Sequence, residues 1–211
     1  MNRKGRAAGR KPGAGKRAGT GTLGPSNPRT PRAFQRSGVL GERELLRGRQ
    51  VPDAKRLSRG PCVVIECVER IPCNPCASAC PRKAITVEPE LTDLPRVDFE
   101  KCNGCTLCVA RCPGLAIFVI DHTYSDRLAA ITLPWEMLPR PEPGSTVTAT
   151  DRAGEPVCRA EVVRVRDAKA LDRCALVTLA VPKKDWNRVR SFRGKGQRGK
   201  GTKGSDRRRK G

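Results

Sequence analysis

Aromatic residues are scarce in this sequence: two tryptophans, one tyrosine and four phenylalanines make up 3% of its 211 residues. A chain with so few large side chains builds a small hydrophobic core, and small cores usually need a disulfide or a metal to hold them together. Histidine is rarer still, because His122 is the only one. We interpret His122 as a surface or packing residue, since it has no second histidine to share a metal with.

Several other features are missing. No apolar run approaches the roughly 18 residues of a membrane-spanning helix, so we expect no membrane span. The N-terminal stretch is rich in Arg, Lys, Gly and Ala and has no apolar segment, so we expect no secretory signal. There is no G-x-G-x-x-G loop, no Ser/His/Asp set and no conspicuous pair of carboxylates. We therefore expect a protein that is not itself a catalyst.

Acidic residues are outnumbered, with 21 Asp and Glu against 43 Lys and Arg, which gives a net charge of +22. The excess is confined to the ends. Residues 1–60 hold 16 basic and 3 acidic residues, and residues 192–211 hold 9 and 1, whereas residues 61–191 hold 18 and 17. Because the end segments are also rich in Gly and poor in apolar residues, we predict disordered basic tails at 1–60 and 193–211.

Cysteine is the residue type that the sequence has in abundance. All eleven cysteines lie between Cys62 and Cys174, and nine of them lie between Cys62 and Cys112. An odd number at two-residue gaps does not resemble a disulfide framework. We therefore expect reduced thiols that bind metal, in a protein of the cytoplasm.

Four cysteines form a complete motif. They lie in the stretch Cys102-Asn-Gly-Cys105-Thr-Leu-Cys108-Val-Ala-Arg-Cys112-Pro113, which reads C-x2-C-x2-C-x3-C-P. This spacing is typical of bacterial ferredoxins with two clusters, in which three thiolates hold one 4Fe–4S cluster and the fourth crosses to the other. The closing proline has no N–H and turns the chain away after the fourth ligand.

The preceding cysteines follow the same motif with one departure. The stretch from Cys73 to Cys80 repeats the last three cysteines, again ending in Cys-Pro, but Arg70 occupies the position of the first one. A guanidinium cannot ligate iron. Cys67 is the nearest thiol upstream, and we predict it to be the displaced first ligand. Cys62 remains the alternative.

Crossing of the fourth ligands gives two sets of thiolates. The first predicted 4Fe–4S cluster has the ligands Cys67, Cys73, Cys76 and Cys112. The second has the ligands Cys102, Cys105, Cys108 and Cys80. Zinc is the alternative metal, because paired C-x2-C spacings also bind zinc. A zinc site, however, needs neither a second set of four thiolates nor the Cys-Pro endings, so we favour iron–sulfur clusters.

Apolar stretches flank each cysteine group, at 63–65 and 84–87 around the first and at 97–99 and 115–120 around the second. The order strand, cysteines, strand thus occurs twice, as an internal duplication of about 35 residues. We predict that residues 61–120 form a ferredoxin-like two-cluster domain of the α+β class.

The next segment, residues 121–192, has a different texture. Its β-type stretches, separated by Gly and Pro turns, lie at 128–133, 146–150, 158–165 and 175–181. Short strands of this kind predict a small antiparallel β-barrel or sandwich module. We expect its two isolated cysteines, Cys158 and Cys174, to be small buried apolar residues.

Residues 62–120 resemble the two-cluster bacterial ferredoxin domain. The stretch from Glu66 to Pro81, together with Leu133-Pro134-Trp135-Glu136, is similar to the ferredoxin-type electron-transfer subunits of multi-subunit FAD-dependent dehydrogenases that act on hydroxyproline, proline or sarcosine. The resemblance implies two 4Fe–4S clusters that relay single electrons. It also implies a flavin subunit that oxidises a secondary amine as the partner.

The module at 121–191 has no ligand set and no nucleotide loop, so we expect it to be a docking surface with Trp135 as an apolar interface anchor. A nucleic-acid-associated iron–sulfur protein is the alternative, because the basic tails could contact phosphates. Those tails contain only Phe34 and Phe192 as aromatic residues, which leaves little for base stacking. Nucleic acid is therefore the less favoured partner.

Overall fold

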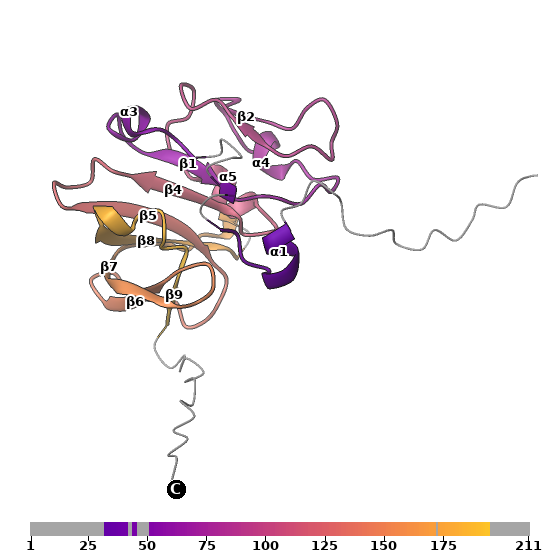
Figure 1. The fold of residues 1–211 in the computed structure, drawn as a ribbon. Coiled ribbons are helices and arrows are strands. Elements are labelled where there is room, and N and C mark those ends of the chain that lie inside the picture. The colour runs from indigo at the N-terminus through magenta and orange to yellow at the C-terminus, as the bar shows by residue number, and fades with distance from the viewer. Residues whose placement is uncertain (1–31, 42–43, 46–50, 172, 195–211) are drawn as a thin grey trace, which may run out of the picture.

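The computed structural model of the chain describes residues 32–41, 44–45, 51–171 and 173–194. Its elements in chain order are α1 (Arg32–Ser37), α3 (Ala54–Leu57), β1 (Cys62–Ile65), α4 (Pro75–Ser78), β2 (Ile85–Thr86), β3 (Arg96–Val97), α5 (Leu107–Arg111), β4 (Ile117–Asp121), β5 (Leu128–Trp135), β6 (Thr146–Thr150), β7 (Pro156–Arg166), η1 (Lys169–Leu171), β8 (Ala175–Pro182), η2 (Lys183–Asp185) and β9 (Ser191–Arg193). One sheet has the strand order β1-β4-β5-β8-β7-β6-β9, and a second sheet pairs β2 with β3 (Figure 1).

The predicted duplication is present. In the first half the chain runs through β1, α4 and β2, and in the second half through β3, α5 and β4. The halves interlock, because β1 pairs antiparallel with β4, with Val64 opposite Phe118, and β2 pairs with β3, with Ile85 opposite Val97. All four strands expected here are found, although β2 and β3 have only two residues each.

Both faces of the β1–β4 pair are buried, which explains why its sequence is apolar without alternation. Successive side chains of a strand point to opposite faces. Cys62 and Val64 accordingly pack into a large core shared with the later strands, whereas Val63 and Ile65 pack into a second core that contains most of the clustered cysteines. The pair therefore separates a purely structural core from the cysteine-rich one.

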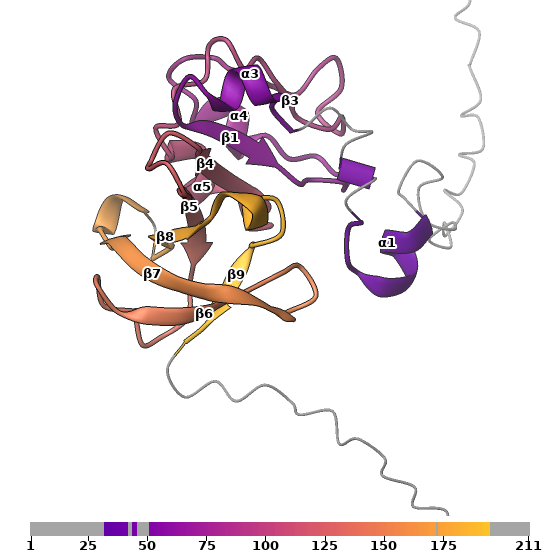
Figure 2. The same cartoon turned by 60° about the vertical axis from the view of Figure 1, so that its left-hand side comes forward.

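The later strands do not form the separate barrel or sandwich that the sequence predicts. They continue the same sheet, because β4 pairs with β5 through Ile120 and Ile131. Strand β7 pairs with β6 in its first half and with β8 in its second half, so the sheet bends around the large core (Figure 2). Within the part of the chain that the structure describes, β1 and β9 end the strand order without pairing, and no closed barrel is seen.

The free edge of β4 explains this continuity. An edge strand exposes unpaired N–H and C=O groups, and covering them is favourable. The short connection after Asp121 returns the chain as a hairpin, so β5 is the first strand able to cover that edge. One core then serves both parts, with residues from Leu57 through Phe192 in the same apolar cluster.

The N-terminal tail predicted for 1–60 is too long at its C-terminal end. Helix α3 begins after Asp53, whose carboxylate caps it by accepting a hydrogen bond from the Arg56 N–H at 2.7 Å. Arg56 and Leu57 are buried, and Leu40 is also buried near α1. The polar composition of this segment hides these few anchoring residues. The remainder of the predicted tails, at 1–31 and 195–211, lies outside the described residues.

Trp135 is not an interface anchor. Its side chain is 3% exposed and stacks on Phe192 of β9, with 3.9 Å between the ring centroids. Leu133 is fully buried, and the exposed apolar residues of this region are Met137 and Leu138, with Leu138 78% exposed. Burial in the shared core therefore replaces the docking role that the sequence indicates for the tryptophan.

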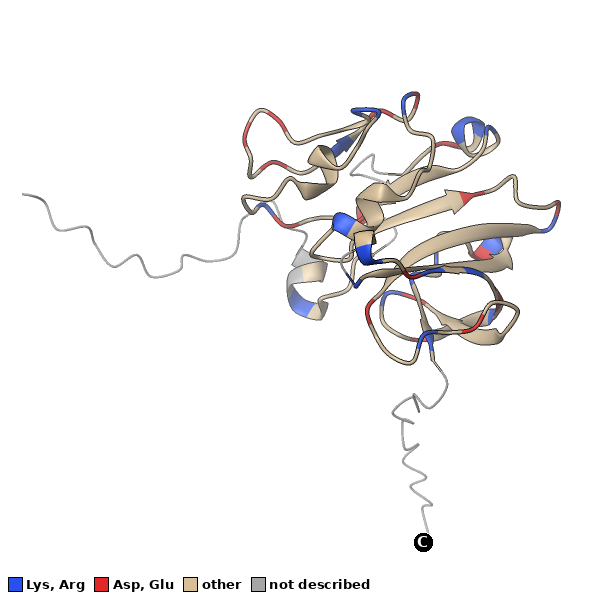
Figure 3. Ribbon diagram, turned by 180° about the vertical axis from the view of Figure 1, so that it is seen from behind, with Lys and Arg blue, Asp and Glu red and all other residues tan. Residues whose placement is uncertain are grey.

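The expectations for the isolated residues are met in part. Cys174 is buried, and Cys158 is partly buried against the large core. The His122 ring packs edge-on against Trp186, with 5.5 Å between ring centroids, as expected for a packing residue. Among the described residues no helix is long and apolar enough to cross a membrane. Figure 3 shows Lys and Arg interspersed with Asp and Glu along the loops, in keeping with the nearly balanced charge of residues 61–191.

Candidate iron–sulfur site

The first predicted set of cysteines lines one cavity. Cys67 follows β1, Cys73 and Cys76 lie at the start of α4, and Cys112 comes directly after α5. These four thiols line the cavity together with apolar residues that include Ile65 and Ile117. The fourth thiol thus comes from the other half of the duplication, as the crossed arrangement requires.

The second predicted set lines a second cavity. Its wall contains Cys80 from the first half and the three cysteines of the loop before and at the start of α5: Cys102, Cys105 and Cys108. Val63 and Val119 of the β1–β4 pair close this cavity on the apolar side. The β1–β4 pair therefore contributes apolar side chains to both cavities.

The acidities of two buried thiols follow the same grouping. Burial raises the pKa of Cys76 to about 11, with contributions from the thiols of Cys112, Cys67 and Cys73. Burial likewise raises the pKa of Cys108 to about 12, with contributions from Cys102, Cys105 and Cys80. Each buried thiol is therefore surrounded by the other members of its own set. Binding of a metal centre would have to displace these protons, since the thiolate is the ligand.

Cys62, the alternative first ligand, faces away from both cavities. It is fully buried in the large core on the other face of β1. Burial raises its pKa to about 11, in spite of the nearby positive charge of Arg56. Cys67 is the thiol that the fold brings to the first cavity. Arg70, which stands where the motif has its first cysteine, instead forms an ion pair with Asp93 at 2.7 Å.

The two halves share a backbone device that holds the crossing cysteines. Three residues after each of them, Lys83 and Leu115 have positive φ angles of 49° and 51°. The chain then turns so that the next N–H group points back at the sulfur: Ala84 N lies 3.2 Å from Cys80 Sγ, and Ala116 N lies 3.4 Å from Cys112 Sγ. N–H donors to sulfur stabilise thiolates and tune the potentials of iron–sulfur clusters.

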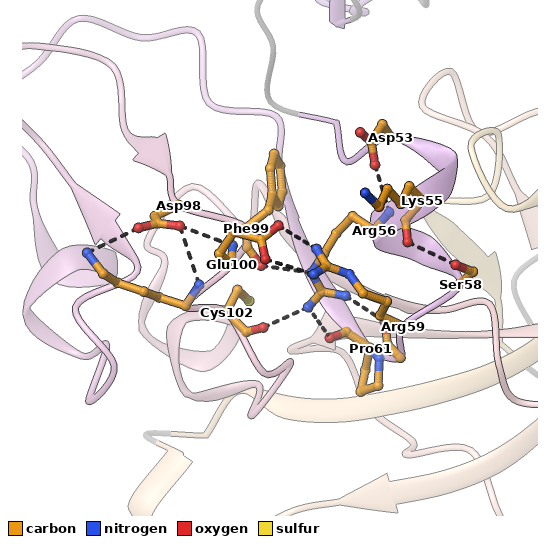
Figure 4. Close-up of polar contacts among 12 residues, drawn as sticks. Asp53, Lys55, Arg56, Ser58, Arg59, Pro61, Asp98, Phe99, Glu100 and Cys102 are labelled. Atoms are coloured by element: carbon orange, nitrogen blue, oxygen red, sulfur yellow. Dashed lines mark hydrogen bonds and ion pairs between the residues drawn. The ribbon is translucent and has the colours of Figure 1, made fainter.

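An arginine outside the motif fixes Cys102. The buried guanidinium of Arg56 donates to the carbonyl oxygens of Phe99 at 2.7 Å, Gly60 at 3.0 Å, Pro61 at 3.0 Å and Cys102 at 2.7 Å (Figure 4). It joins α3, the start of β1 and the loop of the second set. The sequence indicates none of this, because Arg56 lies in a basic, polar segment.

A buried charge cluster lies beside Cys67. Glu66 accepts from Arg152 at 2.8 and 2.6 Å and from Arg190 at 2.5 Å. Burial alone would raise the pKa of Glu66, but the two arginines outweigh it and the pKa is lowered. Both arginines come from the later strands, which ties them to the first cavity. The three residues are far apart in the sequence, so no local pattern reveals the cluster.

The donor sets suit iron–sulfur clusters. In each case four thiols surround a cavity, apolar side chains line the rest of it, and N–H groups point at the sulfurs. Within the described ranges, no group of three or more His, Cys, Asp or Glu side chains is arranged to hold a single metal ion.

Comparisons with known proteins agree with this chemistry. Residues 67–116 match the family model described as a 4Fe-4S dicluster domain. The chain is 39% identical over 56 residues to the ferredoxin-type protein NapF of Haemophilus influenzae, a match that covers 26% of this chain and 32% of that protein. The chain thus matches about a third of that relative's length. No solved structure matches significantly. The protein therefore contains an iron–sulfur electron-transfer domain of the ferredoxin type.

Proposed function

We propose that this protein relays single electrons through two 4Fe–4S clusters. The observation that carries the proposal is the pair of cavities, each lined by four thiols with the fourth crossing between the halves. The family match supports it, because the matched stretch begins at Cys67 and includes all eight predicted ligands, whereas Cys62 lies outside. When bound, such clusters supply one-electron redox chemistry.

The chain's own residues hold and insulate the clusters. The first would be bound by Cys67, Cys73, Cys76 and Cys112, and the second by Cys102, Cys105, Cys108 and Cys80. Ile65 and Ile117 exclude water on one side and Val63 and Val119 on the other. Water exclusion and N–H donors to sulfur set cluster potentials. We also place the protein in the cytoplasm, where its thiols would remain reduced.

Iron analysis tests this part of the proposal. The full chain, reconstituted without oxygen with iron and sulfide, should contain about eight atoms of each, as two 4Fe–4S clusters require. Electron paramagnetic resonance of the reduced protein should show two interacting clusters. Four iron atoms per chain would contradict the two-cluster assignment, and stoichiometric zinc without visible absorption would contradict the iron–sulfur assignment.

The electron donor in the proposal is an FAD-dependent dehydrogenase subunit that oxidises a secondary amine. Its support is the resemblance of the segments 66–81 and 133–136 to subunits of such complexes, together with a β-rich part that has no predicted ligands. The loop after β5 presents Met137 and Leu138 to solvent, and exposed apolar side chains of this kind anchor interfaces. The isolated chain should have no dehydrogenase activity.

A pull-down tests the partner. Leu138→Asp should weaken recovery of a flavoprotein from native extract and leave the cluster spectrum unchanged. Leu91→Asp is the matched control, because Leu91 is 48% exposed but lies outside the β-rich part. Equal recovery with both variants would refute the docking role of the loop. Failure to recover any flavoprotein with the unmodified chain would refute the dehydrogenase partner.

A further inference from the structure

A pocket of about 390 Å³ opens beside the first set of thiols. Cys67, Cys73 and Cys112 line both this pocket and the first cavity, so a molecule in the pocket would lie against the proposed ligands of the first cluster. The described lining of the pocket contains no thiol of the second set. Pockets that bind small molecules have volumes of about 300–1,000 Å³ and are mostly apolar, with a few polar groups, and this one meets both conditions.

The pocket results from a difference between the duplicated halves. Arg82 and Gly114 occupy the same position, two residues after a crossing cysteine. At the second cavity Arg82 lines the wall and donates from Nε to the Lys101 carbonyl at 3.3 Å. At the first, Gly114 lines the pocket, and a Cβ added to it would meet nothing within 4 Å. The missing side chain leaves the first site accessible.

The lining favours an uncharged aromatic ligand. Phe34 from α1 and Phe118 from β4 both contribute to the wall, and flat rings pack well against phenylalanine. The charges in the wall are already compensated, because Glu66 is paired with Arg152 and Arg190. An anionic ligand would also lie next to a cluster that four thiolates make negative, which is unfavourable.

One hydrogen-bond donor in the wall suits a ring oxygen. Arg152 uses Nε and Nη2 to bind Glu66, and among the described residues its Nη1 has no hydrogen-bond partner. A carbonyl oxygen on the ligand could accept from it. An uncharged aromatic ring with carbonyl oxygens that also exchanges electrons is a quinone.

We propose that this pocket binds a quinone, which accepts electrons leaving the first cluster. In the balanced reaction the quinone takes up two electrons, one from each reduced cluster, and two protons from water, and becomes the quinol. The proposal goes beyond the proposed function, since it names an acceptor rather than the donor, and it requires no flavoprotein.

Calorimetric titration of the oxidised full chain with menadione measures binding directly, because neither component can then reduce the other. The unmodified chain should bind menadione at a single site. Gly114→Arg, which copies the residue of the other half, should weaken binding at least tenfold. Leu107→Arg is the control, because it adds the same charge at an exposed position beside the second set. It should change the affinity by less than about twofold.

Phe34→Ala provides a second variant that lies outside the cysteine motifs, in case Gly114→Arg fails to take up iron. Loss of the aromatic wall should weaken binding roughly three- to tenfold, the equivalent of one ring contact. Stopped-flow mixing of the dithionite-reduced chain with menadione should give an oxidation rate that saturates with quinone concentration. No binding by the unmodified chain, or unchanged binding in both pocket variants, would overturn the proposal. An iron content of eight per chain in the same sample would show that the proposed clusters are nevertheless present.

Discussion

Replacing Arg56 by methionine tests whether an arginine outside the cysteine motifs holds the second site together. The substitution keeps an apolar stem of similar length but removes the guanidinium. Four backbone carbonyls then lose their donor, including those of Cys102 and Pro61. Since Cys102 is a proposed ligand, we expect the damage to be concentrated at the second cluster.

The expected loss of stability follows from the number of bonds and their burial. A hydrogen bond from a charged donor contributes about 1.5–3 kcal/mol, but four bonds from one group do not add up, because some freed carbonyls can reach water. We therefore expect Arg56→Met to lower the free energy of unfolding by roughly 3–5 kcal/mol, a large part of the 5–15 kcal/mol typical of a domain. Arg56→Lys should recover only part of this, since an ammonium lacks the planar fork.

The assay is guanidinium unfolding together with iron counting and electron paramagnetic resonance. Arg56→Met should retain the first cluster and lose or convert the second. Arg59→Met is the matched control, because Arg59 lies three residues further on and pairs only with the exposed Glu100 on its side chain. It should behave like the unmodified chain. Retention of both clusters with unchanged stability in Arg56→Met, or equal loss of both, would refute the reasoning.

Three further substitutions test other parts of the site. Cys67→Ala should remove or convert the first cluster while Cys62→Ala leaves both intact, and iron counts showing the reverse would identify Cys62 as the ligand. Glu66→Gln leaves two buried arginines unpaired and should cost about 3–5 kcal/mol in guanidinium unfolding at pH 7. Because the folded pKa of Glu66 is lowered, this deficit should shrink as the pH falls below its ordinary value of 4.5, and a constant deficit would exclude the ion pair as its cause. Gly104→Ala should disrupt the second cluster, since φ is +67° and the new Cβ would lie 2.6 Å from a side-chain carbon, whereas Gly154→Ala, with φ +80° and open space, should show only modest strain.

The cysteine spacing and the strand pattern predicted most of the ferredoxin-type part. The fold brings the two predicted sets of thiols to two cavities, because a motif with a fixed spacing is a local property of the chain. The displaced Cys67 was accessible for the same reason, since Arg70 leaves a gap that only a nearby thiol can fill. The flanking strands were predictable from their continuous apolar composition.

The contacts that fix the site could not be predicted, because they join distant parts of the chain. Glu66 and Arg190 are 124 positions apart, and Arg56 and Cys102 are 46 positions apart. Charged residues at these separations have the same local signature as a solvated surface. Trp135 failed for a related reason: its burial depends on Phe192, in a strand whose sequence Ser-Phe-Arg has only one apolar residue.

These distant contacts change the role of the segments that flank the cysteine motifs. In each set the first ligand comes at the end of a strand or loop, where only neighbouring backbone could hold it. Arg56, from the segment before β1, holds the backbone at Cys102, and Arg152 and Arg190, from the strands after β4, hold Glu66 directly before Cys67. Each half of the duplication therefore receives its arginine from outside the ferredoxin-type part. A chain of about 60 residues suffices to supply the thiols, but the rigidity that keeps a cluster's geometry constant as it gains and loses an electron has to come from a supporting shell. In this protein the flanking segments provide that shell, and the continuous sheet and the buried α3 are what it takes to deliver both arginines.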